Sequence, residues 1–167
     1  TSRYDVVTGN EIRPLDRIGL LDRKLRVVFE NTNDENEYIN ISLLALKRIY
    51  GYDFQGDNVL IARKNLLFTY IEFFEEKLKK EPSIDLLKEA AKIISWNIWQ
   101  MDGMKYVIPY SCHKDQTVQL SLFEDMQEEP EFCKGCRTGD IYLHNGMYSK
   151  IKDWRSNRIV KFIDIVK

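Results

Sequence analysis

The chain has 167 residues, 44% of them hydrophobic, which is enough to bury the core of one compact domain, and we expect a single domain over residues 1–167. Its 25 lysines and arginines face 26 aspartates and glutamates, so the net charge of −1 gives no support to a polybasic nucleic-acid binder. No apolar run approaches the ~20 residues that span a bilayer, and the first residues carry no secretory signal. We therefore expect a cytoplasmic protein without membrane contact.

Apolar residues recur at helical spacing in four stretches of the first hundred residues. We expect helices over residues 16–30, from the polar linker 31–36 to Gly51, from about residue 57 to about residue 80, and from Leu86 to about Trp96. Short aromatic or apolar stretches at residues 49–54 and 97–103 predict strands beside these helices. Helices that alternate with short strands indicate an α/β fold, with long helices around a small, mostly parallel sheet.

The last third of the chain is less regular. Residues 110–140 show no periodicity, so we expect an irregular loop insertion that contains the cysteines. Alternation of Ile159, Lys161 and Ile163 predicts a strand near the end. A local basic segment that could contact DNA phosphates, but that is more often a solvated face, consists of Lys150, Lys152, Arg155, Arg158 and Lys161 around Trp154.

Two carboxylates stand at the ends of the first two predicted strands. Asp53 follows one strand and Asp102 the other, and parallel α/β sheets bind ligands outside the carboxyl ends of their strands. A carboxylate in the first position can accept hydrogen bonds from both ribose hydroxyls, and one in the neighbouring position from an adenine amine. Phe54 would then cover the face of the base. The alternative is that both aspartates are ordinary turn or helix-capping residues, and spacing alone does not decide between these roles.

Two longer stretches contain these aspartates, residues 50–67 (YGYDFQGDNVLIARKNLL) and residues 97–104 (NIWQMDGM). The first joins tyrosine-glycine-x-acid to a helix with alanine-arginine-x-asparagine-leucine, and the second is a strand that ends in an aspartate. They resemble the second and third motifs of adenine-specific DNA methyltransferases of restriction-modification systems. Residues 20–28 (LLDRKLRVV) and 150–155 (KIKDWR) also resemble large methyltransferase subunits and fused restriction-methylation polypeptides.

The resemblance implies a Rossmann-like fold that transfers a methyl group from S-adenosylmethionine to adenine N6 of DNA. It implies that Asp53, Phe54 and Asp102 hold the adenosine half of this cofactor, and that the partners are double-stranded DNA and a restriction or specificity subunit. The family's glycine loop has no match here. The family's catalytic asparagine-proline-proline-tyrosine has none either, since residues 108–110 (IPY) resemble only the last two residues of that motif. We therefore expect the central part of a larger methyltransferase domain, which alone does not catalyse methyl transfer.

The three cysteines are an odd number, which argues against a disulfide framework. Cys133 and Cys136 have the spacing that lets two thiolates bind one tetrahedral ion, and Cys112 is a third candidate ligand. We take His113, next to Cys112, as the fourth ligand, while His144 is the other candidate. The sequence thus contains a candidate zinc site, with free thiols as the alternative.

Residues 119–123, QLSLF, resemble the pentapeptide through which bacterial replication and repair proteins dock into the sliding clamp. Leu122 and Phe123 can fill an apolar pocket while Gln119 makes polar contacts, although apolar side chains such as Leu120, Leu122 and Phe123 more often anchor a loop to its own domain. The alternative to a methyltransferase is therefore a zinc-stabilised binding module that recruits a partner such as the clamp.

Overall fold

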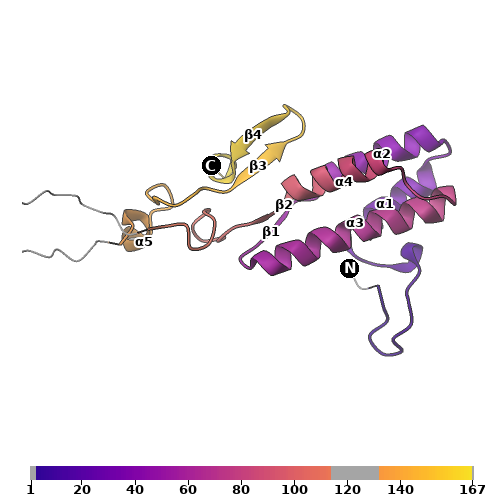
Figure 1. Ribbon diagram of the computed structural model, residues 1–167, viewed down its shortest axis with the longest axis horizontal. Helices are drawn as coiled ribbons and strands as arrows, with labels where there is room; N and C mark the ends of the chain where they lie inside the picture. The colour runs from indigo at the N-terminus through magenta and orange to yellow at the C-terminus, as the bar shows by residue number, and fades with distance from the viewer. Residues whose placement is uncertain (1–2, 114–131, 167) are drawn as a thin grey trace, which may run out of the picture. The chain divides into compact units, whose positions relative to one another are not determined.

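The computed structural model describes residues 3–113 and 132–166, and this part of the chain combines helices with two two-stranded sheets (Figure 1). The α/β class expected from the sequence is confirmed. The longer helices are α1 (Leu20–Asn31), α2 (Glu35–Lys47), α3 (Gly56–Leu78) and α4 (Ile84–Asn97), and the short ones are α5 (Lys134–Thr138) and the 3₁₀ helices η1 (Pro14–Asp16) and η2 (Phe162–Ile165). The strands are β1 (Gly51–Asp53), β2 (Ile98–Gln100), β3 (Lys150–Asp153) and β4 (Arg158–Lys161). None of the helices in this described part is long and apolar enough to cross a membrane.

The chain divides into two compact units. The helical unit consists of Thr1–Gly51 and Asp57–Trp99, and the C-terminal unit consists of Tyr52–Gly56 and Gln100–Lys167. The division falls within β1 and β2 rather than in a polar linker, which is why the composition of the sequence gives no sign of it.

Helices α2 and α4 each begin at a side chain that caps the first turn. Asp34 accepts a hydrogen bond of 2.9 Å from the N–H of Glu37, and Ser83 accepts one of 3.3 Å from the N–H of Leu86. Such caps satisfy N–H groups that have no partner within the helix, and each contributes about 1 kcal/mol. The polar interruptions of the sequence pattern are therefore the starting points of helices.

Aromatic side chains of α3 form the centre of the helical unit. Tyr70 and Phe73 are fully buried, and the ring of Phe74 lies 6.2 Å from that of Tyr38 on α2. In the last turn of α3, the ammonium group of Lys77 donates to the carbonyls of Phe29 and Thr32, both at 2.6 Å. These carbonyls close α1, so α3 both fills the core and caps a neighbouring helix.

A buried ion pair holds the segment before α1 against α3. The side chain of Arg17 is 0% exposed, and its guanidinium group donates to the carboxylate of Glu72 and to the carbonyl of Ile12, the latter at 2.9 Å. Arg3 donates to the same carboxylate at 3.0 Å. A buried guanidinium group is stable only when its hydrogen-bonding groups are satisfied, so Glu72 fixes the path of this segment.

Strands β1 and β2 form a parallel pair, in agreement with the two strands expected around Asp53 and Asp102. Just beyond β2, the N–H of Met101 donates to the carbonyl of Asp53 at 3.0 Å. The ends of the two strands therefore lie at the same edge, and Asp102 is the residue that follows this contact.

The second sheet is antiparallel, so the described sheets are not mostly parallel as expected. Strands β3 and β4 pair with Lys150 opposite Lys161 and Asp153 opposite Arg158. The expected strand near the end of the chain is present as β4, but Ile163 lies in η2. Within residues 110–140, expected to be irregular, the described part includes the short helix α5.

The ion pair of Arg17 gives a prediction for the stability of the helical unit. Glu72→Ala removes the closest carboxylate from a fully buried guanidinium group and leaves it the more distant and exposed carboxylate of Glu11, at 3.5 Å, so we expect a loss of about 3 to 5 kcal/mol of unfolding free energy. The matched control is Glu35→Ala, whose partner Lys80 is exposed, with an expected loss of at most about 1 kcal/mol. Urea unfolding followed by helical circular dichroism measures both losses, and equal losses would contradict the importance of the buried pair.

Candidate functional site

Four side chains from three stretches of the sequence come together in the C-terminal unit. Cys112, Cys133, Cys136 and His144 each offer one ligand atom, and all four atoms lie within 4.8 Å of one another. Nδ1 of His144 is 3.6 Å from Sγ of Cys112, 3.6 Å from Sγ of Cys133 and 3.7 Å from Sγ of Cys136. The three thiols thus surround one imidazole nitrogen at almost equal distances.

These distances match those between the ligands of tetrahedral zinc. With Zn–S of about 2.3 Å and Zn–N of about 2.0 to 2.1 Å, tetrahedral angles place sulfur and nitrogen about 3.6 Å apart. The Cys3His group could therefore bind a metal such as zinc. All four ligands come from this chain, which is the pattern of a closed, structural site rather than a catalytic one.

Two glycines let the backbone approach the cluster closely enough. A Cβ atom at Gly135, in α5, would lie 2.6 Å from the backbone nitrogen of His144 and 2.8 Å from its ring. A Cβ atom at Gly146 would lie 2.8 Å from Sγ of Cys112. Real Cβ atoms do not approach so closely, so any side chain at either position would displace a candidate ligand.

Hydrogen bonds around Cys133 favour its thiolate. Burial raises the pKa of Cys133, but hydrogen bonds from the N–H groups of Asn145 and Cys136, together with His144 and Cys112, outweigh burial and lower the pKa to about 6. The N–H of Asn145 lies 3.3 Å from this sulfur. For Cys112, burial and hydrogen bonds to the other two thiols raise the pKa to about 11. Thiolate is the form that binds metals, so the cluster holds Cys133 in its ligating state.

Tyr148 supports the backbone of His144 from outside the cluster. Its hydroxyl group accepts a hydrogen bond of 3.2 Å from the N–H of His144 and donates one of 2.8 Å to the carbonyl of Ile141. Such outer contacts orient metal ligands and are part of most metal sites.

The structure brings His144 rather than His113 to the three thiols. His113 is exposed, and its backbone exchanges hydrogen bonds of 3.2 and 2.9 Å with the side chain of Asn145. His113 therefore braces the segment next to the cluster through its backbone. The sequence gives one signal for His144, because Asn145 and Gly146 indicate a turn at which this histidine can fold back onto the thiols.

The two aspartates expected to hold adenosine also lie in the C-terminal unit, and both take part in turns. Oδ1 of Asp53 accepts a hydrogen bond of 2.8 Å from the N–H of Gln55, and Oδ1 of Asp102 accepts one of 2.9 Å from the N–H of Met104. Oδ2 of Asp102 lies 4.0 Å from Nζ of Lys105, and its side chain is 15% exposed. The turn role weighed as the alternative is thus present for both residues, and it fixes each carboxylate at the end of its strand.

Aromatic residues surround these strand ends. Phe54 is 37% exposed, and its ring meets that of Tyr110 edge to face, with centroids 5.5 Å apart. A Cβ atom at Gly103 would lie 3.0 Å from the ring of Tyr52, so this ring covers the glycine that follows Asp102. The edge therefore combines two anchored carboxylates with accessible aromatic surface.

Comparison with known proteins adds no assignment, because no family model, no curated protein and no solved structure matches the chain. The QLSLF pentapeptide at residues 119–123, which resembles a clamp-binding peptide, lies outside the described residues.

Proposed function

We propose that this chain is part of an S-adenosylmethionine-dependent DNA methyltransferase of a restriction-modification system that acts on adenine N6. In this proposal Asp53, Phe54 and Asp102 hold the adenosine half of the cofactor, and the α/β arrangement is the Rossmann-like fold of that family. The observation that carries the proposal is the hydrogen bond from Met101 to the carbonyl of Asp53, which aligns the ends of two parallel strands. Such an edge is where α/β sheets bind nucleosides.

Each residue has a role that its chemistry suits. The carboxylate of Asp53 would accept hydrogen bonds from the ribose hydroxyls, and that of Asp102 from the adenine amine. The exposed ring of Phe54 would stack on the base. S-adenosylmethionine would supply the methyl group, and the proposed partners are double-stranded DNA and a restriction or specificity subunit.

Replacing each aspartate by asparagine separates cofactor binding from the turn role. Asparagine keeps the Oδ1 acceptor that Gln55 and Met104 use, but it removes the negative charge. We expect Asp53→Asn and Asp102→Asn each to weaken S-adenosylmethionine binding by about 1.5 to 3 kcal/mol while the fold is retained. Ligand-observed NMR titration of the zinc-loaded chain measures these affinities even in the millimolar range.

The matched control is Asp153→Asn, because Asp153 also accepts from the N–H two residues later, at 2.9 Å, and lies in the same unit. We expect this variant to bind the cofactor like the original chain. Unchanged affinity in both test variants, or no cofactor binding by the original chain, would refute the assignment.

We also propose that the Cys3His group binds one structural zinc ion. The geometry of Cys112, Cys133, Cys136 and His144 supports this, because one imidazole nitrogen lies 3.6 to 3.7 Å from three sulfurs. A zinc-stabilised module that recruits the sliding clamp would share this metal site. Cofactor titration separates the two functions, since only the methyltransferase requires S-adenosylmethionine.

The two histidines provide a direct test of the zinc ligands. We expect His144→Ala to weaken zinc binding more than tenfold, since even outer partners of metal ligands contribute about 10- to 100-fold. His113→Ala is the control and should bind zinc normally, because His113 contacts Asn145 through its backbone, which the substitution retains. Competition with a chromophoric chelator gives the affinities. Loss of binding in the His113 variant but not in the His144 variant would overturn the ligand set.

A further inference from the structure

We propose that one face of the β3–β4 hairpin binds the sugar-phosphate backbone of DNA. We call this face, which carries Lys150, Lys152 and Lys161, the lysine face. The strand register of the hairpin places the lysines on one face. That the anion bound there is DNA rests on the proposed methyltransferase function.

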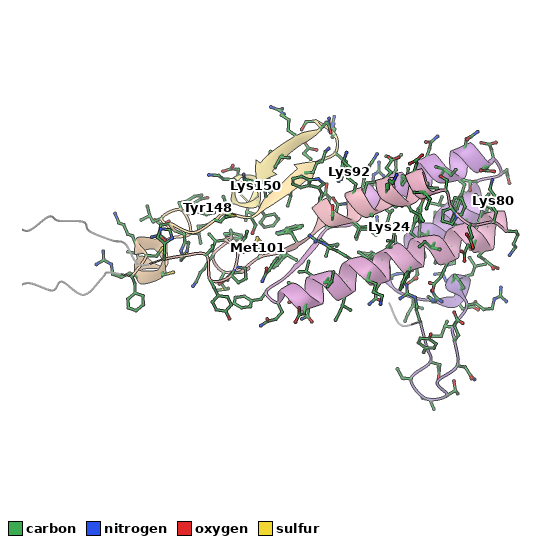
Figure 2. All side chains as sticks on the ribbon, viewed as in Figure 1. Lys24, Lys80, Lys92, Met101, Tyr148 and Lys150 are labelled. Atoms are coloured by element: carbon green, nitrogen blue, oxygen red, sulfur yellow. The ribbon has the colours of Figure 1, made fainter. Side chains whose placement is uncertain are left out.

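The strand register puts the three lysines on one side. Lys150 stands directly opposite Lys161, so their side chains project from the same face of the sheet, and Lys152 lies two residues further along β3. Ile151 projects from the opposite face and is 7% exposed, whereas Ile159, opposite Lys152, is 53% exposed. The lysine face is therefore the solvent side of the hairpin, and Figure 2 labels Lys150 on β3.

Direct opposition of two lysines is unfavourable in a free hairpin. Cβ atoms of directly opposed residues lie about 4.5 to 5.5 Å apart, and like charges at this distance destabilise the pair. Lys150 and Lys161 form no ion pair with any other residue that the structure describes. A phosphate placed between the two ammonium groups would relieve this repulsion, which gives the face a reason to prefer an anionic ligand.

The acid of the hairpin does not neutralise the lysine face. Asp153 stands opposite Arg158, on the side of Ile151, and its carboxylate accepts hydrogen bonds from the N–H of Arg155 and the hydroxyl of Ser156. These bonds hold the turn, and the hydroxyl of Ser156, followed by the N–H of Arg155, lowers the pKa of Asp153. Arg155, exposed in this turn, extends the cationic surface beyond the strands.

Aromatic rings hold two of the lysines in place. Nζ of Lys152 lies 4.7 Å from the ring centroid of Trp154, and Nζ of Lys161 lies 5.4 Å from that of Tyr148. Tyr148 is itself fixed by its hydrogen bonds to His144 and Ile141. Restricting a lysine before binding reduces the entropy that it loses on contact with phosphate. A two-stranded β-ribbon is also narrow enough to follow a DNA groove.

The test uses the zinc-loaded chain and a fluorescein-labelled 20-base-pair duplex, with anisotropy measured at several salt concentrations. We expect the double variant Lys150→Gln/Lys161→Gln to weaken binding about tenfold or more at low salt. The slope of log K against log salt should fall by about two, because each phosphate contact contributes about 0.9. Unchanged zinc content and near-ultraviolet circular dichroism establish that this variant is folded.

The control Lys79→Gln/Lys88→Gln removes the same charge from two lysines whose side chains are each 72% exposed on the helical unit, and it should leave affinity and slope unchanged. Equal losses in both double variants, or no duplex binding by the original chain, would overturn the proposal. Binding to phosphatidylserine vesicles without duplex binding would also overturn it and would assign the face to a lipid surface. The cofactor titration contains no DNA, so failure of the hairpin proposal and failure of the proposed function are distinguishable.

Discussion

The C-terminal unit has a small core, and its Cys3His cluster could hold three stretches of the chain together by binding a metal. Few of its described hydrophobic side chains are buried, namely Met101, Val107, Cys133, Ile151 and Ile163. Burial of so few apolar side chains offsets little of the conformational entropy that this part of the chain loses on folding. The cluster joins three separate stretches of this unit, and the free energy of binding a metal there would become free energy of folding.

The helical unit is stabilised in a different way. Its aromatic core around Phe73 and Phe74 buries large apolar surfaces, which is the usual source of stability in a domain. The buried pair of Arg17 and Glu72 adds a fixed path for the N-terminal segment rather than a large gain in stability. One chain thus contains one unit held by hydrophobic burial and another that a metal would hold, and chelation should affect only the second.

The periodic parts of the fold were predictable from the sequence, because a helix or strand repeats its apolar residues at a fixed spacing. The helices α1 to α4 and the strands β1 and β2 follow this pattern, with Asp53 at the end of β1 and Asp102 two residues beyond the end of β2. Strand β3 was not predicted. Its charged residues alternate with only one buried apolar residue, Ile151, and this pattern is too short to recognise.

The cluster was predictable only in part, because a local spacing identifies Cys133 and Cys136 but not the partners that tertiary structure brings to them. The choice of His144 over His113 depends on the close approach that Gly135 permits, and that contact joins residues on two sides of a turn. The prediction of His113 as the fourth ligand was wrong, because it relied on the adjacency of His113 to Cys112. The backbone of His113 instead exchanges hydrogen bonds with the side chain of Asn145.

X-ray absorption at the zinc K-edge of the purified chain tests most directly whether a Cys3His zinc site organises the C-terminal unit. We expect one zinc per chain, with three sulfur ligands at about 2.3 Å and one nitrogen ligand at about 2.0 to 2.1 Å. A chain that contains no zinc, or zinc with oxygen ligands and fewer than three sulfurs, would contradict this expectation.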